Sequence, residues 1–133
     1  MKTILIVDDE FGIVEALASL LEDEGYRVVT AANGEDGLAR LRKEQPNLVL
    51  IDLMMPIIDG QEMLRIMRST PTHASIPVIV MSAAPKSTAV LKSEKAREIS
   101  AFLRKPFDLQ TLLDTIAPLI GPGEQPMSSV QSR

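Results

Sequence analysis

The sequence predicts an α/β fold with a doubly wound, parallel β-sheet. Short apolar segments alternate five times with segments of helical periodicity. Three of the apolar segments, 4–7, 48–51 and 78–81, do not alternate with polar residues, which is typical of strands covered by helices on both faces. A chain of 133 residues, 45% of them hydrophobic, is sufficient for one packed core. We therefore expect a single domain in residues 1–120.

Each of the five apolar segments is interpreted as one strand of this sheet. The expected strands are Thr3–Asp8, Arg27–Ala31, Leu48–Asp52, Pro77–Ser82 and Ala101–Arg104. The three purely apolar segments should be the central strands, because only central strands are buried on both faces along their whole length.

The segments between the strands predict five helices. In the first helix, the residues expected to share one apolar face are Ile13, Leu17, Leu20 and Leu21. In the fifth, they are Leu109, Leu112, Leu113 and Ile116. The fourth helix, within 87–99, has an irregular apolar stripe, and we expect it to be the most mobile.

Turn-forming and capping residues stand at the expected helix ends. Gly25 suits the end of the first helix, and Asn33 and Asp59, each followed by glycine, suit the starts of the second and third. Asp108, shortly after Pro106, suits the start of the fifth. Residues 121–133 contain turn formers and few residues to bury, so we expect a disordered C-terminal tail.

Composition excludes several classes of protein. A net charge of −4 disfavours direct nucleic-acid binding, which needs clustered cations. The chain has no cysteine and one histidine, so neither a disulfide framework nor a zinc site is expected. The apolar segment 4–7 is too short for a membrane span or a signal peptide. The expected compartment is the cytoplasm.

Reactive residue types follow four of the five predicted strands. The first strand leads into Asp8-Asp9, the third ends in Asp52, the fourth ends in Ser82, and Lys105-Pro106 follow the fifth. In a doubly wound sheet the carboxyl ends of the strands share one edge, where ligands bind. Clustered carboxylates repel unless a cation joins them, and all-oxygen ligands suit Mg²⁺. A lysine and a hydroxyl beside them favour a phosphoryl group as the ligand.

The most suitable nucleophile in this cluster is Asp52, which ends the central third strand between the acid pair and Ser82. The chain has neither a glycine-rich phosphate loop nor a serine–histidine arrangement in its motifs. The pattern therefore favours phosphoryl transfer onto the protein's own carboxylate.

Four segments that carry these residues resemble the receiver domains of bacterial response regulators, and the resemblance extends over about residues 2–118. The matching segments are Ile-Leu-Ile-Val-Asp-Asp-Glu at 4–10, Leu-Val-Leu-Ile-Asp-Leu-Met-Met-Pro at 48–56 with Asp59-Gly60, Val-Ile-Val-Met-Ser-Ala at 78–83, and Phe-Leu-Arg-Lys-Pro-Phe at 102–107. The resemblance implies a flavodoxin-like sheet in the order 2-1-3-4-5 with five helices.

The resemblance also implies a role for each residue of the site. Asp52 would be the phosphoacceptor and, with Asp9 and the backbone carbonyl of Met54, would bind Mg²⁺ directly, whereas Asp8 would hold the metal through water. The phosphoryl group would be contacted by Ser82 and Lys105.

Two further features are implied by the family. The peptide bond between Lys105 and Pro106 would be cis. Phosphorylation would draw Ser82 toward the phosphoryl group and turn Phe102 inward, changing the surface formed by the fourth helix, fifth strand and fifth helix. Phosphoryl groups would come from a histidine kinase or a histidine phosphotransfer protein. We expect a monomer or a weak, phosphorylation-dependent dimer, with an unidentified downstream protein partner.

The sequence leaves alternatives open. A phosphatase or phosphomutase with an aspartyl intermediate is disfavoured because such enzymes usually carry a second acid two residues after the nucleophile, where this chain has Met54. A receiver-like domain that is never phosphorylated is disfavoured by the full set of acids, hydroxyl and lysine. Met54 and Ala84 have no polar group to orient an attacking water, so we hypothesise slow autodephosphorylation.

Overall fold

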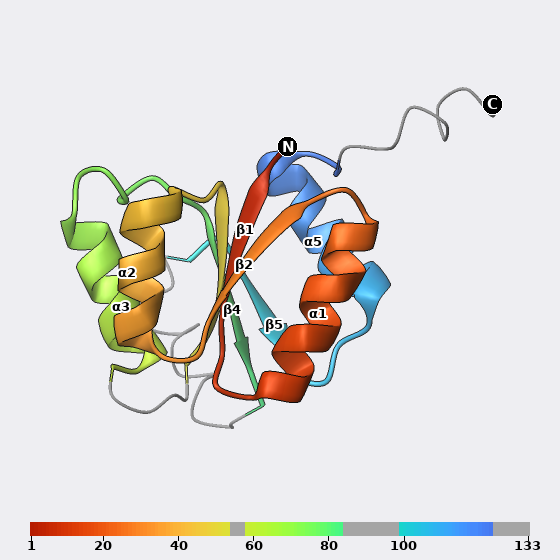
Figure 1. The fold of residues 1–133 in the computed structure, drawn as a ribbon, viewed down its shortest axis with the longest axis horizontal. Helices are drawn as coiled ribbons and strands as arrows, with labels where there is room; N and C mark the ends of the chain where they lie inside the picture. The colour runs from red at the N-terminus through yellow and green to blue at the C-terminus, as the bar shows by residue number, and fades with distance from the viewer. Residues whose placement is uncertain (54–57, 84–98, 124–133) are drawn as a thin grey trace.

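Five parallel strands form one sheet in the order β2-β1-β3-β4-β5 in the computed structural model (Figure 1). The model describes residues 1–53, 58–83 and 99–123. The strands are β1 (Thr3–Val7), β2 (Arg27–Ala31), β3 (Leu48–Asp52), β4 (Val78–Ser82) and β5 (Ala101–Arg104). The predicted strand order and parallel pairing are confirmed, and the predicted ends differ by at most one residue, at Asp8 and Pro77.

Four of the five predicted helices lie within the described residues. They are α1 (Phe11–Asp23), α2 (Gly34–Glu44), α3 (Gly60–Ser69) and α5 (Leu109–Ile120). The predicted fourth helix and its expected mobility fall outside the described residues, except for Ile99. The same is true of most of the predicted C-terminal tail, 124–133.

The helices cover both faces of the sheet, with α2 and α3 on one side and α1 and α5 on the other (Figure 1). Successive strand residues point to opposite faces, and β1 illustrates this: Leu5 and Val7 pack in the core under α2 and α3, whereas Ile4 and Ile6 pack in the core under α1 and α5. All four are fully buried. This explains why the central strands are apolar without alternation.

Capping side chains begin three of the four described helices. Asn33 accepts a hydrogen bond from the backbone N–H of Asp36, as Asp59 does from Glu62 and Asp108 from Thr111. The three predicted caps are therefore confirmed. Gly25, just after α1, has a φ of 95°, a left-handed conformation that glycine adopts without strain.

The predicted apolar face of α1 is wrong at two of its four positions. Ile13 and Leu20 are 38% and 40% exposed, whereas Val14, Leu17 and Leu21 are buried. These three buried residues are spaced by three and four positions, which places them on one side of the helix. The apolar part of α1 is wider than the strip that the sheet covers, so Ile13 and Leu20 remain on its solvent side.

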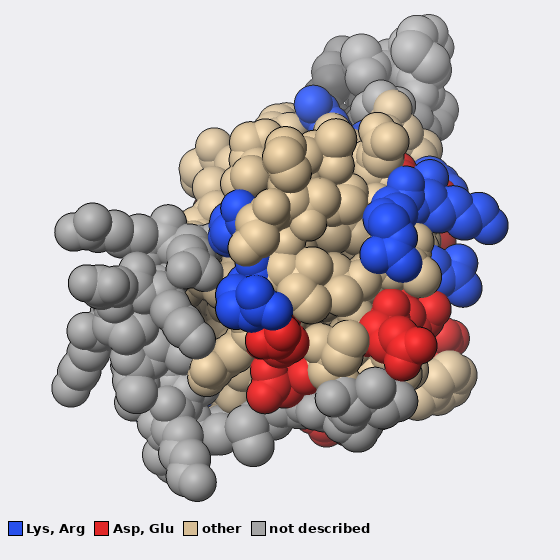
Figure 2. All heavy atoms as spheres, turned by 90° about the vertical axis from the view of Figure 1, so that its left-hand side faces the viewer, with Lys and Arg blue, Asp and Glu red and all other residues tan. Residues whose placement is uncertain are grey.

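Charged side chains on the face formed by α2 and α3 are sorted along the helices. Acidic residues occupy the first turn of each helix and basic residues the last turn, an arrangement that complements the helix dipoles. In Figure 2 the acidic side chains of this face lie below the basic ones, toward the end of the molecule where β4 ends in Figure 1. Among the described residues, no helix has both the length and the apolar character that a membrane crossing requires.

Candidate functional site

The carboxyl edge of the sheet carries the polar residues that the sequence predicts for a site. Asp52 and Ser82 are the last residues of β3 and β4, Asp8 directly follows β1, and Lys105 directly follows β5. Because β2 lies on one side of β1 and the later strands on the other, the chain changes its winding direction between β1 and β3, the position where such sheets bind ligands.

Backbone hydrogen bonds continue from the strands into the site. Asp8 donates its N–H to the carbonyl of Ala31 at 3.1 Å, and Lys105 donates to the carbonyl of Ser82 at 3.1 Å. The peptide bond between Lys105 and Pro106 is cis, the geometry that the family resemblance implies. Hydrogen bonds to neighbouring strands therefore fix the backbone of Asp8 and of Lys105.

Lys105, which follows β5, forms ion pairs with three carboxylates that follow or end β1 and β3. Its Nζ lies 2.7 Å from Asp8 Oδ2, 3.4 Å from Asp52 Oδ2 and 3.2 Å from Glu10 Oε1. Burial alone would lower the pKa of Lys105, but hydrogen bonding and charge from Asp8, then the charge of Asp52 and the hydrogen bond of Glu10, outweigh it and raise the pKa above 10.5. The ammonium is therefore held in its charged form.

One lysine does not neutralise the acids that surround it. Carboxylate oxygens of Asp8, Glu10 and Asp52 all lie within 4.8 Å of one another, and Asp8 and Asp52 are only 1% and 4% exposed. Two like charges about 4 Å apart repel by about 4 kcal/mol at an effective dielectric of about 20. Within the part of the chain that the structure describes, these three carboxylates and the Lys105 ammonium leave a net negative charge, which favours binding of a cation.

The donor atoms fit magnesium better than a transition metal. Every candidate ligand in this cluster is a carboxylate oxygen, and hard cations such as Mg²⁺ take one or two carboxylates, with waters and phosphate oxygens completing the octahedron. Zinc prefers nitrogen and sulfur ligands. The site is therefore suited to a magnesium ion.

The remaining predicted site residues have different surroundings. Ser82 is 1% exposed at the end of β4. Asp9 is exposed and lines a hollow beside the cluster, and its role as a metal ligand stays a prediction. Phe102 is half-buried on β5 and packs against the core under α2 and α3. Met54 lies outside the described residues.

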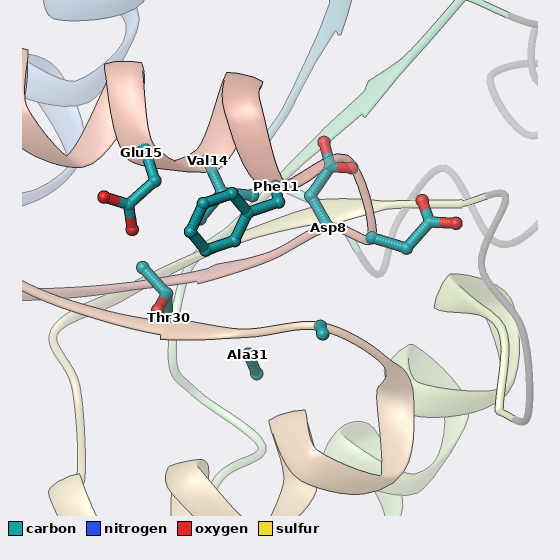
Figure 3. A pocket seen from close by; sticks show the side chains of 8 residues that line it. Asp8, Phe11, Val14, Glu15, Thr30 and Ala31 are labelled. Atoms are coloured by element: carbon teal, nitrogen blue, oxygen red, sulfur yellow. The ribbon is translucent and has the colours of Figure 1, made fainter.

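A shallow hollow of about 80 Å³ opens beside the acid pair, between α1 and β2 (Figure 3). Phe11 and Val14 of α1 lie across from Thr30 and Ala31 of β2, and Glu15 points toward Thr30. Pockets that hold cofactor-sized or drug-sized molecules are about 300–1,000 Å³. This hollow is too small to hold a nucleotide beside the acids.

Two glycines bond the backbone on either side of residues 54–57, at Leu53 and Ile58. Gly60 donates its N–H to Leu53 O at 3.2 Å, and Gly34 donates to Ile58 O at 3.0 Å. A Cβ on Gly34 would lie 2.2 Å from Ile58 O, and one on Gly60 would lie 2.4 Å from Asp52 O. Only glycine allows the starts of α2 and α3 to approach this backbone so closely, which fixes it on either side of 54–57.

Glu10 is the member of the cluster that the sequence analysis did not single out. The sequence places two acids before it at the same strand end, and nothing in the pattern tells which of the three turns toward Lys105. The Asp8 side chain accepts a hydrogen bond from the backbone N–H of Glu10 at 3.0 Å. This bond fixes the turn at Glu10, from which its side chain reaches Lys105.

Comparison with known proteins points in one direction. A family model described as the response regulator receiver domain matches residues 4–117. Protein PilH of Pseudomonas aeruginosa is 38% identical over 118 residues, which cover 87% of this chain and 95% of that protein. Sporulation initiation phosphotransferase F of Bacillus subtilis is 37% identical over 115 residues, covering 86% of this chain and 90% of the relative.

Solved structures resemble the fold over the same part of the chain. The chemotaxis protein CheY4 of Vibrio cholerae superposes with a TM-score of 0.80 at 30% identity, covering 90% of this chain and 98% of that one. The response regulator TrrA of Thermotoga maritima, solved in complex with Mg²⁺ and BeF, superposes with a TM-score of 0.79 at 30% identity, covering 90% of this chain and 99% of the other.

Proposed function

This chain belongs to the response regulator receiver domain family of two-component signalling, and from this premise we propose that it is a phosphorylation-dependent switch whose phosphoacceptor is Asp52. The phosphoryl group would come from a phosphohistidine of a histidine kinase or phosphotransfer protein. One of the relatives, from Bacillus subtilis, is itself named a phosphotransferase. The site and the signalling surface then belong to one domain, residues 1–120.

The observation that carries this proposal is the position of Lys105. Its ammonium lies 3.4 Å from the Asp52 carboxylate and 2.7 Å from that of Asp8, although these residues are 53 and 97 positions away in the sequence. A cation held beside a buried carboxylate at a strand end is suited to neutralise the oxygens of a phosphoryl group attached there.

The proposed reaction forms one bond and breaks one. An oxygen of Asp52 attacks the phosphorus of the donor phosphohistidine, a P–O bond forms, and the P–N bond breaks as the imidazole leaves and takes up a proton. Lys105 and Ser82 would contact the transferred oxygens. Mg²⁺, held by Asp9, Asp52, the Met54 carbonyl and, through water, Asp8, would supply charge neutralisation. The chain acts as an acceptor and not as an enzyme with a separate substrate.

The proposed output is a change in surface. Ser82 and Phe102 lie on the neighbouring strands β4 and β5, so a movement of the hydroxyl toward the phosphoryl group leaves space for the ring. The surface of the fourth helix, β5 and α5 would then bind a protein partner or pass the phosphoryl group onward. The population of the active conformation can shift only by as much as the phosphoryl group binds that conformation more tightly than the inactive one.

The partners would be proteins, and the chain itself a monomer or a weak phosphorylation-dependent dimer. Phe11 at the start of α1 is 76% exposed beside the site, and Ile13 is 38% exposed. Exposed apolar side chains next to a reactive group favour docking of a protein donor. The cytoplasmic location stays a prediction.

Intact-mass measurement tests the proposal directly. The chain is incubated with phosphoramidate, a small phosphoryl donor, and Mg²⁺, beside Asp52→Asn and a control variant, Asp23→Asn, at the end of α1. We expect one added phosphoryl group on the parent and the control, and none on Asp52→Asn. Modification of Asp52→Asn, or of no variant at all, would contradict the proposal. Turnover of added phosphate esters would instead favour the phosphatase interpretation.

A further inference from the structure

We propose that Glu10 competes with the phosphoryl group for Lys105, so that this glutamate sets how readily the site enters its modified state. The inference rests on the proposed function and adds a positioning residue to it. Its basis is the ion pair between Lys105 Nζ and Glu10 Oε1, at 3.2 Å. Glu10 stands at the rim, with 54% of its side chain exposed, against 0% for Asp8 and 6% for Asp52.

Glu10 is directed toward Lys105 and away from its own helix. It occupies the N-cap position of α1 but makes no side-chain cap bond. Among the four described helices, the other three N-cap residues, Asn33, Asp59 and Asp108, each accept a hydrogen bond from the residue three positions later. The first turn of α1 contains no acidic residue either. The Glu10 carboxylate therefore pairs with Lys105 and does not cap α1.

The three ion pairs use the full donor capacity of the lysine. An ammonium has three N–H donors, and three carboxylates lie within hydrogen-bonding distance of Nζ. A phosphoryl oxygen on Asp52 can bind Lys105 only if one of these bonds is released. Water can replace Lys105 at Glu10, which is exposed, more easily than at Asp8, which is buried. Of the two bonds that do not involve Asp52 itself, the one to Glu10 is thus the more easily released.

This arrangement predicts that loss of the Glu10 charge affects Mg²⁺ binding and phosphoryl binding differently. Loss of the Glu10 charge should not weaken Mg²⁺ binding more than loss of any nearby surface charge does, because the inference makes Glu10 a partner of Lys105 and not a metal ligand. It should strengthen binding of a phosphoryl group, because Lys105 no longer has to leave a carboxylate. A residue with a purely structural role would not separate the two affinities in this way.

Calorimetric titration of the full 133-residue chain tests the inference. Mg²⁺ affinity is measured first, and then the affinity for beryllofluoride, a phosphoryl mimic, at saturating Mg²⁺. The variants are Glu10→Gln, which removes the charge, and Glu10→Asp, which keeps the charge but shortens the side chain. The control is Glu15→Gln, which removes an equal charge five residues later on α1, at the hollow beside the acids.

We expect Glu10→Gln to bind beryllofluoride about threefold more tightly than the parent, the scale of one exposed ion pair, and Glu10→Asp to change in the same direction by less. Glu15→Gln should bind beryllofluoride as tightly as the parent does. Its Mg²⁺ affinity should equal that of Glu10→Gln, because each variant loses one nearby charge. Unchanged or weaker beryllofluoride binding by both Glu10 variants would overturn the inference. So would a tenfold loss of Mg²⁺ affinity in Glu10→Gln alone, which would make Glu10 a metal ligand.

The same titration separates this inference from the proposed function. If the parent binds beryllofluoride and the Glu10 variants do not differ from it, the inference fails while the proposed function stands. If the parent binds no beryllofluoride in the presence of Mg²⁺ and takes up no phosphoryl group, both fail together.

Discussion

The two edges of the same sheet use polar groups in opposite ways. At the amino edge, Asn47 accepts a hydrogen bond from Thr3 N at 2.8 Å with its side chain and donates its own N–H to Thr3 O at 2.8 Å. The Tyr26 hydroxyl nearby donates to Gly121 O at 2.8 Å. These are neutral groups, each paired with a complementary partner. The Asn47 bonds join the starts of β1 and β3, and the Tyr26 bond joins the start of β2 to the end of α5.

At the carboxyl edge, about 13 Å away along strands that rise about 3.3 Å per residue, charges of one sign are concentrated. Among residues 1–53, 58–83 and 99–123, three carboxylates share the Lys105 ammonium there. The arrangement costs stability in the absence of a cation, because the buried acids repel. The amino edge is therefore built for stability, whereas the carboxyl edge retains unfavourable negative charge that a bound cation would relieve.

Replacing Lys105 at the carboxyl edge should have the largest effect on stability. Lys105→Met keeps the aliphatic stem but removes the ammonium that Asp8 and Asp52 both contact, and we expect the free energy of unfolding to fall by about 2 kcal/mol. Partial exposure of the site keeps this below the value for a fully buried pair. Urea unfolding near neutral pH without Mg²⁺ measures it.

Lys43→Met is the matched control, because Lys43 is exposed in the last turn of α2. Its change should stay within about 0.5 kcal/mol. Equal losses in the two variants would mean that Lys105 is an ordinary surface lysine and that the two edges do not differ.

Removing a polar group at the amino edge should lower stability and leave the chemistry intact. Asn47→Ala leaves the N–H of Thr3 without its side-chain acceptor, which should cost about 1 kcal/mol. Phosphoryl uptake on Asp52 should continue at the parent rate, since the two edges are separate. The measurements are urea unfolding and the time course of intact mass with phosphoramidate. A large loss of uptake at full stability would contradict this separation of roles.

The smallest expected effect is the titration of Tyr26. Burial raises its pKa, the charge of Glu24 raises it further, and a backbone hydrogen bond involving Gly123 opposes both, with a net pKa above 10.0. A raised pKa means that the folded state holds the phenol proton more tightly than the unfolded state does. The resulting stability is present below pH 10 and is lost as the pH rises through the folded-state pKa.

Tyr26 is the only tyrosine and the chain has no tryptophan, so absorbance near 295 nm follows it without interference. We expect an ionisation midpoint above 10.0 in the folded chain, with circular dichroism to verify folding and a urea-unfolded sample as the reference. A midpoint equal to that of the unfolded sample would mean that the Tyr26 hydroxyl is not held at the amino edge.

Much of the fold was predictable because its signals are local. Apolar segments that do not alternate identify buried strands, and Asn33, Asp59 and Asp108 were predicted as caps because a cap depends on residues within one turn. The convergence of Asp8, Asp52 and Lys105 was also predictable, since parallel strands bring their carboxyl ends to one edge.

The errors and omissions involve tertiary contacts. Ile13 and Leu20 belong to the predicted apolar face of α1 but are exposed, because a wide apolar helix face does not indicate how much of it the sheet covers. Ser100, just before β5, bonds Val78 of β4 through both its N–H and its hydroxyl oxygen, a contact between distant segments that no local pattern contains. The direction of the Glu10 side chain depends on Lys105, 95 residues away, which no local pattern contains.

The carboxyl edge should stay electrostatically unfavourable until a cation binds there. The free energy of unfolding of the parent and of Asp52→Asn, measured with and without MgCl₂ at constant ionic strength, tests this. Without Mg²⁺, Asp52→Asn should be more stable than the parent by about 1 kcal/mol, because a repelling charge is removed.

With saturating Mg²⁺ the parent should gain stability, as any ligand that binds only the folded state requires, and Asp52→Asn should gain much less. The difference in the free energy of unfolding between the two proteins would then shrink or change sign. Equal gains in both proteins, or a parent that is already the more stable of the two without Mg²⁺, would contradict the account.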